Sequence, residues 1–277
     1  MIQLDNKTLR RVQLIQLELL VEVDRICKKS GIRYNIIAGT LLGAVRHGGY
    51  IPWDDDADVA LLRPEYEKFR TACETELDQT KFVFQDHRNT PGYRWGYGKL
   101  RRKGTVFLRE HQEHMPYMQG VFIDIFPLDN VPDNYLLRSV HNFQCFCIRK
   151  VLWSEVGKIA HKNPAMRKWY GLLSKVPLKT VFDVYRRLME KGNRKETQMV
   201  RILTFPTPNR AWGYYRRWYE ESAEIRFEGT VFQGIRNWDE YLSFKFGDYM
   251  ALPPEEKRKV HPVTDIQLTA GEENTIC

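Results

Sequence analysis

The chain has 277 residues, of which 43% are hydrophobic, 28% charged and 13% aromatic, and this composition excludes a disordered protein. The net charge is +8, which favours an anionic partner such as a nucleotide, a phosphate polymer, a nucleic acid or an anionic membrane, without choosing among them. The five cysteines are odd in number and include no Cys-X-X-Cys pair, which fits a reducing compartment better than secretion.

The N-terminal stretch MIQLDNKTLRR lacks the apolar core of a signal peptide. No apolar run in the chain approaches the roughly 18 residues that a membrane-spanning helix needs. The sequence therefore predicts a cytoplasmic protein, with contact at the inner face of the membrane left open.

The first half of the chain alternates between helix and strand patterns. Apolar residues three and four apart predict a helix over 7–29 that ends at Gly31. β-branched and aromatic residues predict a strand over 33–38, followed by Gly39 and by one or two helical turns over 40–46. The further predicted elements are a strand over 59–62, a helix over 65–77, a strand over 82–85, a hairpin-like segment over 94–109 and a strand over 120–126.

Beyond Pro132 the pattern becomes mostly helical, and we place a domain boundary there, between residues 1–132 and 133–277. The order of elements predicts an α/β (α+β) class with a mixed sheet core and a helical C-terminal part. The helices predicted in the second part cover 133–162, 165–174, 178–191, 211–222 and 238–249.

Four aspartates, Asp54, Asp55, Asp56 and Asp58, lie within five positions at the mouth of a predicted buried strand. Charges of one sign this close raise one another's pKa unless a cation neutralises them. Because side chains alternate along a strand, Asp54, Asp56 and Asp58 share one face and Asp55 points to the other. Asp56 and Asp58, two residues apart on one face, are therefore candidate Mg²⁺ ligands.

A glycine-bracketed turn, Gly39 to Gly43, precedes the aspartates. Gly39 permits a positive φ angle, and Thr40 can cap a short helix whose free N–H groups face an anion. A hairpin-like return after Gly43 brings the aspartate strand alongside. This arrangement predicts carboxylates opposite an amide-lined anion pocket.

Asp124 is the single charge in the apolar strand Phe122-Ile123-Asp124-Ile125-Phe126. A buried carboxylate is costly without a partner. If its strand lies beside that of Asp56 and Asp58, Asp124 joins the metal site or acts as a general base. The alternative is that Asp124 caps a turn or pairs with an arginine.

Residues 37–69, IAGTLLGAVRHGGYIPWDDDADVALLRPEYEKF, resemble the signature of the LicD family of phosphotransferases, which also includes the fukutin and fukutin-related domains. The resemblance implies a nucleotidyltransferase-like fold. It also implies transfer of a phospho-alcohol, such as phosphocholine or a polyol phosphate, from a CDP-linked donor to a sugar hydroxyl, with CMP as the leaving group. The resemblance continues at GKLRRKGTVF (98–107), GVFIDIFPLDNVPD (120–133) and WDEYLSFKFGDYMALPPEEKRKVH (238–261).

The resemblance also assigns roles to the aspartates. Asp56 and Asp58 match the family's metal-binding aspartates, Asp54 matches a further acidic position, and Asp124 falls where a third carboxylate is expected. The implied cofactor is Mg²⁺ or Mn²⁺. Ala38 departs from the family pattern, in which the residue before the glycine is often another glycine, but its backbone N–H donor remains.

In the expected mechanism, the acceptor hydroxyl attacks the distal phosphorus of the CDP-alcohol, and Mg²⁺ on Asp56 and Asp58 bridges the diphosphate. Asp124 deprotonates the hydroxyl or completes the metal shell. The cationic candidates that neutralise the diphosphate are Arg46, Lys99 and Arg101, whose alternative is a solvated basic face.

The two parts of the chain then take different expected roles. Residues 1–132 form the catalytic core, and residues 133–277 complete the site and form the acceptor surface. Which alcohol is transferred, and whether the acceptor is a teichoic acid, lipopolysaccharide or other cell-surface glycan precursor, stays open.

Two other functions remain as alternatives. One is a nucleotidyltransferase that acts on a small acceptor and releases pyrophosphate, and the other is a nucleotide-binding module without catalysis. The helical part is both basic and aromatic, which fits core packing with solvated charges or, alternatively, contact with a lipid-linked acceptor at a membrane surface. Nucleic acid is not an expected partner, because no motif for it is present.

Overall fold

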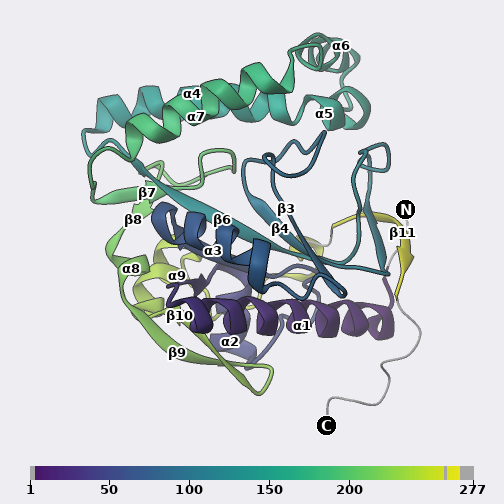
Figure 1. Ribbon diagram of the computed structural model, residues 1–277, viewed down its shortest axis with the longest axis vertical. Coiled ribbons are helices and arrows are strands. Elements are labelled where there is room, and N and C mark those ends of the chain that lie inside the picture. Colours follow the sequence, from purple (N-terminus) through teal and green to yellow (C-terminus); the bar gives the residue numbers. More distant parts are fainter. Residues whose placement is uncertain (1–3, 259–260, 269–277) are drawn as a thin grey trace.

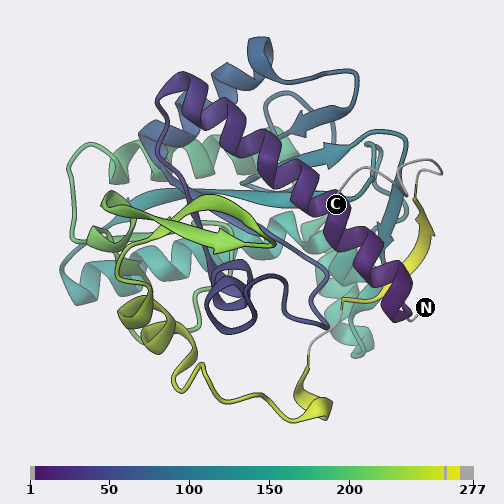
Figure 2. The ribbon, with the colours of Figure 1, turned by 90° about the horizontal axis from the view of Figure 1, so that it is seen from below.

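The computed structural model describes residues 4–258 and 261–268. A mixed sheet runs through the molecule, with α1 and α3 on one face and α2 and α9 on the other (Figure 2). Helices α4 to α7 form a further layer along one edge (Figure 1). The predicted α/β (α+β) class with a mixed sheet is confirmed. The helices are α1 (Asn6–Ser30), α2 (Ala38–His47), α3 (Arg63–Glu76), α4 (Tyr135–Leu152), α5 (Ser154–Ala160), α6 (Pro164–Leu173), α7 (Leu178–Gly192), α8 (Arg217–Glu220) and α9 (Trp238–Phe246).

The main sheet has the strand order β3-β4-β6-β2-β1-β10-β9, and its central pair, β2 and β6, is parallel. Strands β9 and β10 come from the C-terminal part of the chain, and β10 pairs in parallel with β1. The strands of this path are β1 (Asn35–Ile36), β2 (Asp58–Leu62), β3 (Phe82–Gln85), β4 (Gly98–Arg102), β6 (Phe122–Val131), β9 (Ser222–Phe227) and β10 (Thr230–Ile235).

The remaining strands lie at the borders of this sheet. β7 (Met199–Arg201) pairs with the end of β6 and with β8 (Tyr214–Tyr215), whereas β5 (Val106–Arg109) pairs with β11 (Val263–Gln267). In the part of the chain that the structure describes, no helix combines the length and the apolarity that crossing a bilayer requires.

Helix α1 shows why several local predictions held. Asp5 caps its first turn by accepting a hydrogen bond from the Thr8 N–H at 2.7 Å, and Gly31 ends the helix with φ of 63°. Its apolar face, with Leu19, Leu20 and Val23, is fully buried. The spacing of the apolar residues, the N-terminal cap and the C-terminal glycine each depend on nearby residues only, and all three are found in α1.

Three predictions were wrong in detail. The strand predicted over 33–38 is only Asn35–Ile36, because α2 already begins at Ala38. The helix predicted over 211–222 contains β8 and the short α8, since Tyr214 and Tyr215 pair with β7 instead. Strands β4 and β5 both exist, but they do not form a hairpin with each other, because β4 pairs with β3 and β6.

His141 on α4 supplies a pH-dependent contribution to stability. Its side chain is buried, with Nδ1 3.6 Å from Cys145 Sγ. Burial, helped by the charge of Arg201, lowers the pKa of His141 to about 4. Below its ordinary pKa the unfolded chain binds a proton that the folded chain does not, so stability falls as the pH drops from 6.5 towards 4.

We expect the wild-type protein to lose up to about 3 kcal/mol of unfolding free energy over this pH interval relative to His141→Leu. The measurement is urea unfolding of both proteins at pH 7 and at pH 4.5. Parallel losses in the two proteins would contradict the assignment to His141.

Candidate active site

The acidic loop before β2 is held in place by two glutamines of α1. Gln16 is fully buried, and its Nε2 donates to the backbone oxygens of Asp55 at 2.9 Å and Phe122 at 3.2 Å. Gln13 Nε2 donates to the Asp54 oxygen at 2.9 Å. These contacts tie the loop and the start of β6 to α1, and so fix the position of the backbone that carries the carboxylates.

Asp58 and Asp124 are brought together by the pairing of β2 with β6. They are directly opposite partners in the parallel register, and the Asp124 N–H donates to the Ala57 oxygen at 2.9 Å. The strand of Asp124 therefore lies beside the strand of Asp58, which was the condition for Asp124 to join the site.

Asp54, Asp56 and Asp58, which strand alternation predicts on one side, interact electrostatically with one another. Burial raises the pKa of all three carboxyls. The charge of Asp56 raises the pKa of Asp54 further, and the charges of Asp56 and Asp124 do the same for Asp58. A partly buried set of mutually repelling carboxylates offers oxygen ligands only, and this donor set fits a hard divalent cation such as Mg²⁺ or Mn²⁺.

Asp55 lies next to that group and has cationic partners of its own. Its carboxylate is fully buried and accepts from Arg109 Nη1 at 2.5 Å and from His261 Nδ1 at 2.8 Å. Burial alone raises the pKa of Asp55, but the hydrogen bonds and charges of His261 and Arg109 outweigh it and hold the pKa below its ordinary value. Asp55 was predicted to face elsewhere, but one of its oxygens lies within 4.8 Å of ligand atoms of Asp56 and His261, so it stays beside the cluster.

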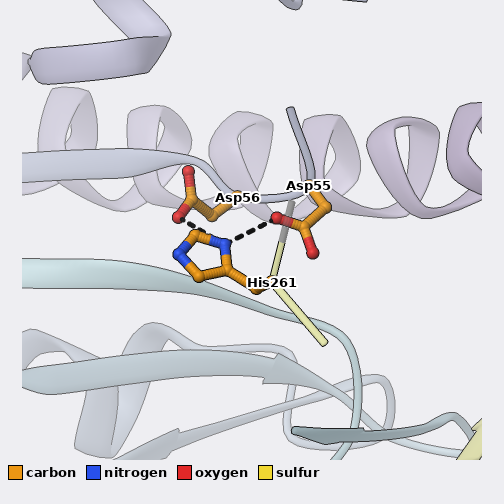
Figure 3. Close-up of side chains that lie close together, drawn as sticks. All are labelled: Asp55, Asp56 and His261. Carbon is orange, nitrogen blue, oxygen red and sulfur yellow. Dashed lines mark hydrogen bonds and ion pairs between the residues drawn. The ribbon is translucent and has the colours of Figure 1, made fainter. Parts of the chain in front are cut away.

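His261 lies between Asp55 and Asp56, with Nδ1 3.7 Å from Asp56 Oδ2 (Figure 3). Within residues 4–258 and 261–268, the ligand atoms of Asp55, Asp56 and His261 lie within 4.8 Å of one another. The sequence signal for His261 was its place at the end of the resembling segment 238–261, but no role was predicted for it.

Lys99 lies opposite Asp124 in the antiparallel pairing of β4 with β6, and the two form a buried ion pair. Burial lowers the pKa of Lys99 to about 8, although the negative charge of Asp124 acts to raise it. The Lys99 ammonium is also 3.4 Å from the centre of the Phe122 ring. Asp124 therefore has a cationic partner, which is a lysine and not the arginine of the alternative considered from sequence.

Arg101 and Arg46 have different surroundings. Arg101 is buried and donates from Nη1 to the Gly120 oxygen at 2.9 Å, and its Nε has no hydrogen-bond partner among the residues that the structure describes. Arg46 lies at the end of α2 and donates to the backbone oxygens of Tyr249 at 2.7 Å and Ala251 at 3.3 Å. In this structure, Arg46 thus binds the segment that follows α9.

The turn at Gly39 to Gly43 differs from the prediction in two respects. Thr40 does not cap α2, because the helix begins at Ala38 after Ile37, and the Thr40 hydroxyl instead accepts from the Asp58 N–H at 2.8 Å. The positive φ angle, 51°, belongs to Ala38 and not to Gly39.

The two glycines of this turn permit close packing. A Cβ on Gly39 would lie 2.7 Å from Asp54 Oδ2, and one on Gly43 would lie 2.4 Å from the Gly49 oxygen. Gly39 therefore allows a carboxylate of the cluster to approach the backbone of α2 closely.

Lys245 on α9 is a cation near the cluster that sequence reasoning missed. Its ammonium donates to the Tyr214 hydroxyl at 3.1 Å, and its charge opposes the raised pKa of Asp58. The signal was available, because Lys245 is the single basic residue in the helix WDEYLSFKF.

Comparison with known proteins gives this site a context. Residues 31–149 match the model of LicD/FKTN/FKRP, nucleotidyltransferase domain. The chain is 28% identical over 265 residues to the lipopolysaccharide cholinephosphotransferase LicD of Haemophilus influenzae, across 93% of this chain and 97% of that protein. It is 36% identical over 64 residues to the human ribitol 5-phosphate transferase FKRP, across 22% of this chain and 13% of that protein. Residues 31–149 of the chain therefore match a LicD-family nucleotidyltransferase domain.

Proposed function

We propose that this LicD-family phosphotransferase moves a phospho-alcohol from a CDP-linked donor to a sugar hydroxyl of a cell-surface glycan precursor and releases CMP. The observation that carries the proposal is the pairing of Asp58 with Asp124 beside Asp54 and Asp56. The whole-length similarity to a cholinephosphotransferase supports phosphocholine as the transferred group, and the shorter similarity to a ribitol 5-phosphate transferase supports a polyol phosphate.

Asp56 and Asp58 would hold Mg²⁺ or Mn²⁺, with Asp124 directly opposite Asp58, and the cation when bound supplies positive charge to the diphosphate of the donor. Asp54 adds a further carboxylate beside Asp56, whose charge raises the pKa of Asp54. His261 and Arg109 hold Asp55, which fixes the backbone on either side of it and thereby the direction of Asp56.

The reaction is a displacement at phosphorus. The acceptor oxygen forms a bond to the distal phosphorus, the bond from that phosphorus to the bridging oxygen breaks, and CMP leaves with the electron pair. Asp124 accepts the proton of the acceptor hydroxyl, and Lys99 stabilises the Asp124 carboxylate through their ion pair. Arg101 and Lys245 supply the nearby positive charge.

We also propose that residues 1–132 form the catalytic core and that residues 133–277 complete the site and form the acceptor surface. Lys245 and His261 support this division of roles, because both follow residue 132 and reach the aspartates of the first part. Transfer is proposed on the cytosolic side, before the glycan is exported.

The direct test incubates the protein with CDP-choline or CDP-ribitol, Mg²⁺ or Mn²⁺, and glycan or teichoic acid precursors. We expect acceptor-dependent release of CMP with one of the two donors. Removing divalent cations with EDTA should lower the rate by about a hundredfold or more, and added Mg²⁺ or Mn²⁺ should restore it.

The same assay separates the alternatives. Release of pyrophosphate from a nucleoside triphosphate and a small acceptor would replace the proposal with nucleotidyl transfer. Binding of CDP and Mn²⁺ in calorimetry, without any product from either donor, would indicate a nucleotide-binding module instead.

A further inference from the structure

The positive charge of the protein is concentrated in the layer formed by α4 to α7. Residues 135–195 contain fourteen Lys and Arg against three Asp and Glu, a net charge of +11. The whole chain has a net charge of +8, from 43 basic and 35 acidic residues, so the remainder has a net charge of −3. A charge this segregated creates a positive field over one part of the surface.

Helix α4 also presents large apolar side chains to water. Leu136 is 73% exposed, Val140 59% and Phe143 65%. These residues are four and three positions apart, so they form one stripe along the helix. The opposite side of α4, with Cys145 and Ile148, is buried against α7 and β7. The helix is therefore apolar on both sides, but only one side has a partner within the described chain.

The apolar stripe and the basic residues meet on one face. Helices α4 and α7 run side by side along the edge of the molecule (Figure 1), and a groove of about 360 Å³ lies between them. Phe143 comes from α4, and Val184, Arg187 and Lys191 come from α7. The groove is lined by Phe143, Gln144, Cys147, Ile148, Val184, Arg187, Leu188 and Lys191.

We propose that this face of α4 and α7 binds the surface of a bilayer that contains anionic lipids. Apolar side chains flanked by Lys and Arg are the composition that inserts into the headgroup region while the cations contact lipid phosphates. A nucleic acid or an anionic glycan would be attracted by Arg187 and Lys191, but it would leave Leu136 and Val140 in water. Exposed leucine, valine and phenylalanine therefore favour a lipid surface, and this inference does not depend on the reaction proposed above.

The first test measures co-flotation of the full chain with vesicles of phosphatidylcholine alone or with about 30% phosphatidylglycerol. We expect binding to the anionic vesicles only, weakened by salt. Arg187→Glu combined with Lys191→Glu should lower the partition coefficient at least about tenfold, because each basic residue near such a surface contributes substantially. The matched control is Lys7→Glu combined with Arg226→Glu, which changes the net charge equally at exposed positions of α1 and β9.

The second test concerns the apolar stripe. Leu136→Ser combined with Phe143→Ser should also lower vesicle binding at least about tenfold, with little effect on the unfolding temperature, since both side chains are largely exposed already. Val21→Ser, at an exposed position of α1, should leave binding unchanged.

Three results would overturn the proposal. The first is an absence of binding to anionic vesicles at low salt, and the second is an equal loss in test and control variants. The third is a concentration-dependent dimer, or a complex with single-stranded nucleic acid, that depends on Leu136 and Phe143 while vesicle binding does not.

Discussion

Asp56→Asn is expected to lower the rate of CMP release by about a thousandfold while the protein stays folded. The loss follows because a metal held by carboxylates supplies several kcal/mol of charge stabilisation in the transition state. The fold should tolerate the change, since asparagine has nearly the same shape and removes one of the charges that raise the pKa values of Asp54 and Asp58. The unfolding temperature without metal should therefore stay level or rise.

The measurement combines single-turnover kinetics with thermal unfolding. The matched control is Asp5→Asn, the same chemical change at the cap of α1, where asparagine serves equally well. Turnover near the wild-type value in Asp56→Asn, at saturating Mg²⁺, would refute the assignment of the metal site.

Asp129→Ala is expected to destabilise the protein by about 3–5 kcal/mol. Asp129 is fully buried on β6 and accepts from Arg63 Nε at 2.7 Å and Nη2 at 2.6 Å. Arg63 also donates to the Tyr185 hydroxyl at 2.9 Å, so the pair connects the sheet to α7. Removing the carboxylate leaves the buried guanidinium with the more exposed Glu67, 3.1 Å from Nη1, in place of a buried counter-ion that accepts two hydrogen bonds.

Urea unfolding measures this loss of unfolding free energy, provided that the slope of the free energy against urea concentration is the same for wild type and variant. Glu74→Ala is the control, because it removes an exposed partner of Arg70 and should cost less than about 1 kcal/mol. Replacing both members, Arg63→Met with Asp129→Leu, should recover much of the loss. A cost below about 1 kcal/mol for Asp129→Ala would show that water reaches Arg63 freely.

The aspartate cluster shows how far local reasoning extends. Strand alternation separated Asp55 from Asp54, Asp56 and Asp58, and in the structure Asp55 does have its own ion pair with Arg109. His261 nevertheless brings Asp55 and Asp56 together within 4.8 Å, because β2 begins only at Asp58 and the residues before it are not held to strand alternation. The unusual position of Asp124 in an apolar strand indicated a partner, although local pattern did not identify it as Lys99.

The turn before the cluster shows where local reasoning failed. Thr40 has the chemistry of a helix cap, yet its hydroxyl binds the Asp58 N–H, which becomes available only once β2 lies beside α2. The helix predicted over 211–222 was wrong for a similar reason, because Tyr214 and Tyr215 form strand pairs with β7 in place of a helical turn.

The sequence by itself determined the class of fold and placed four aspartates close together before a buried strand, because these features depend on composition and on periods of a few residues. The tertiary structure alone decided which cationic side chains approach the aspartates of the site. Lys99 meets Asp124 through strand pairing, Lys245 approaches Asp58 from α9, and His261 reaches Asp55 from 206 residues away. Such partners depend on the register and packing of the whole sheet, so no local pattern specifies them.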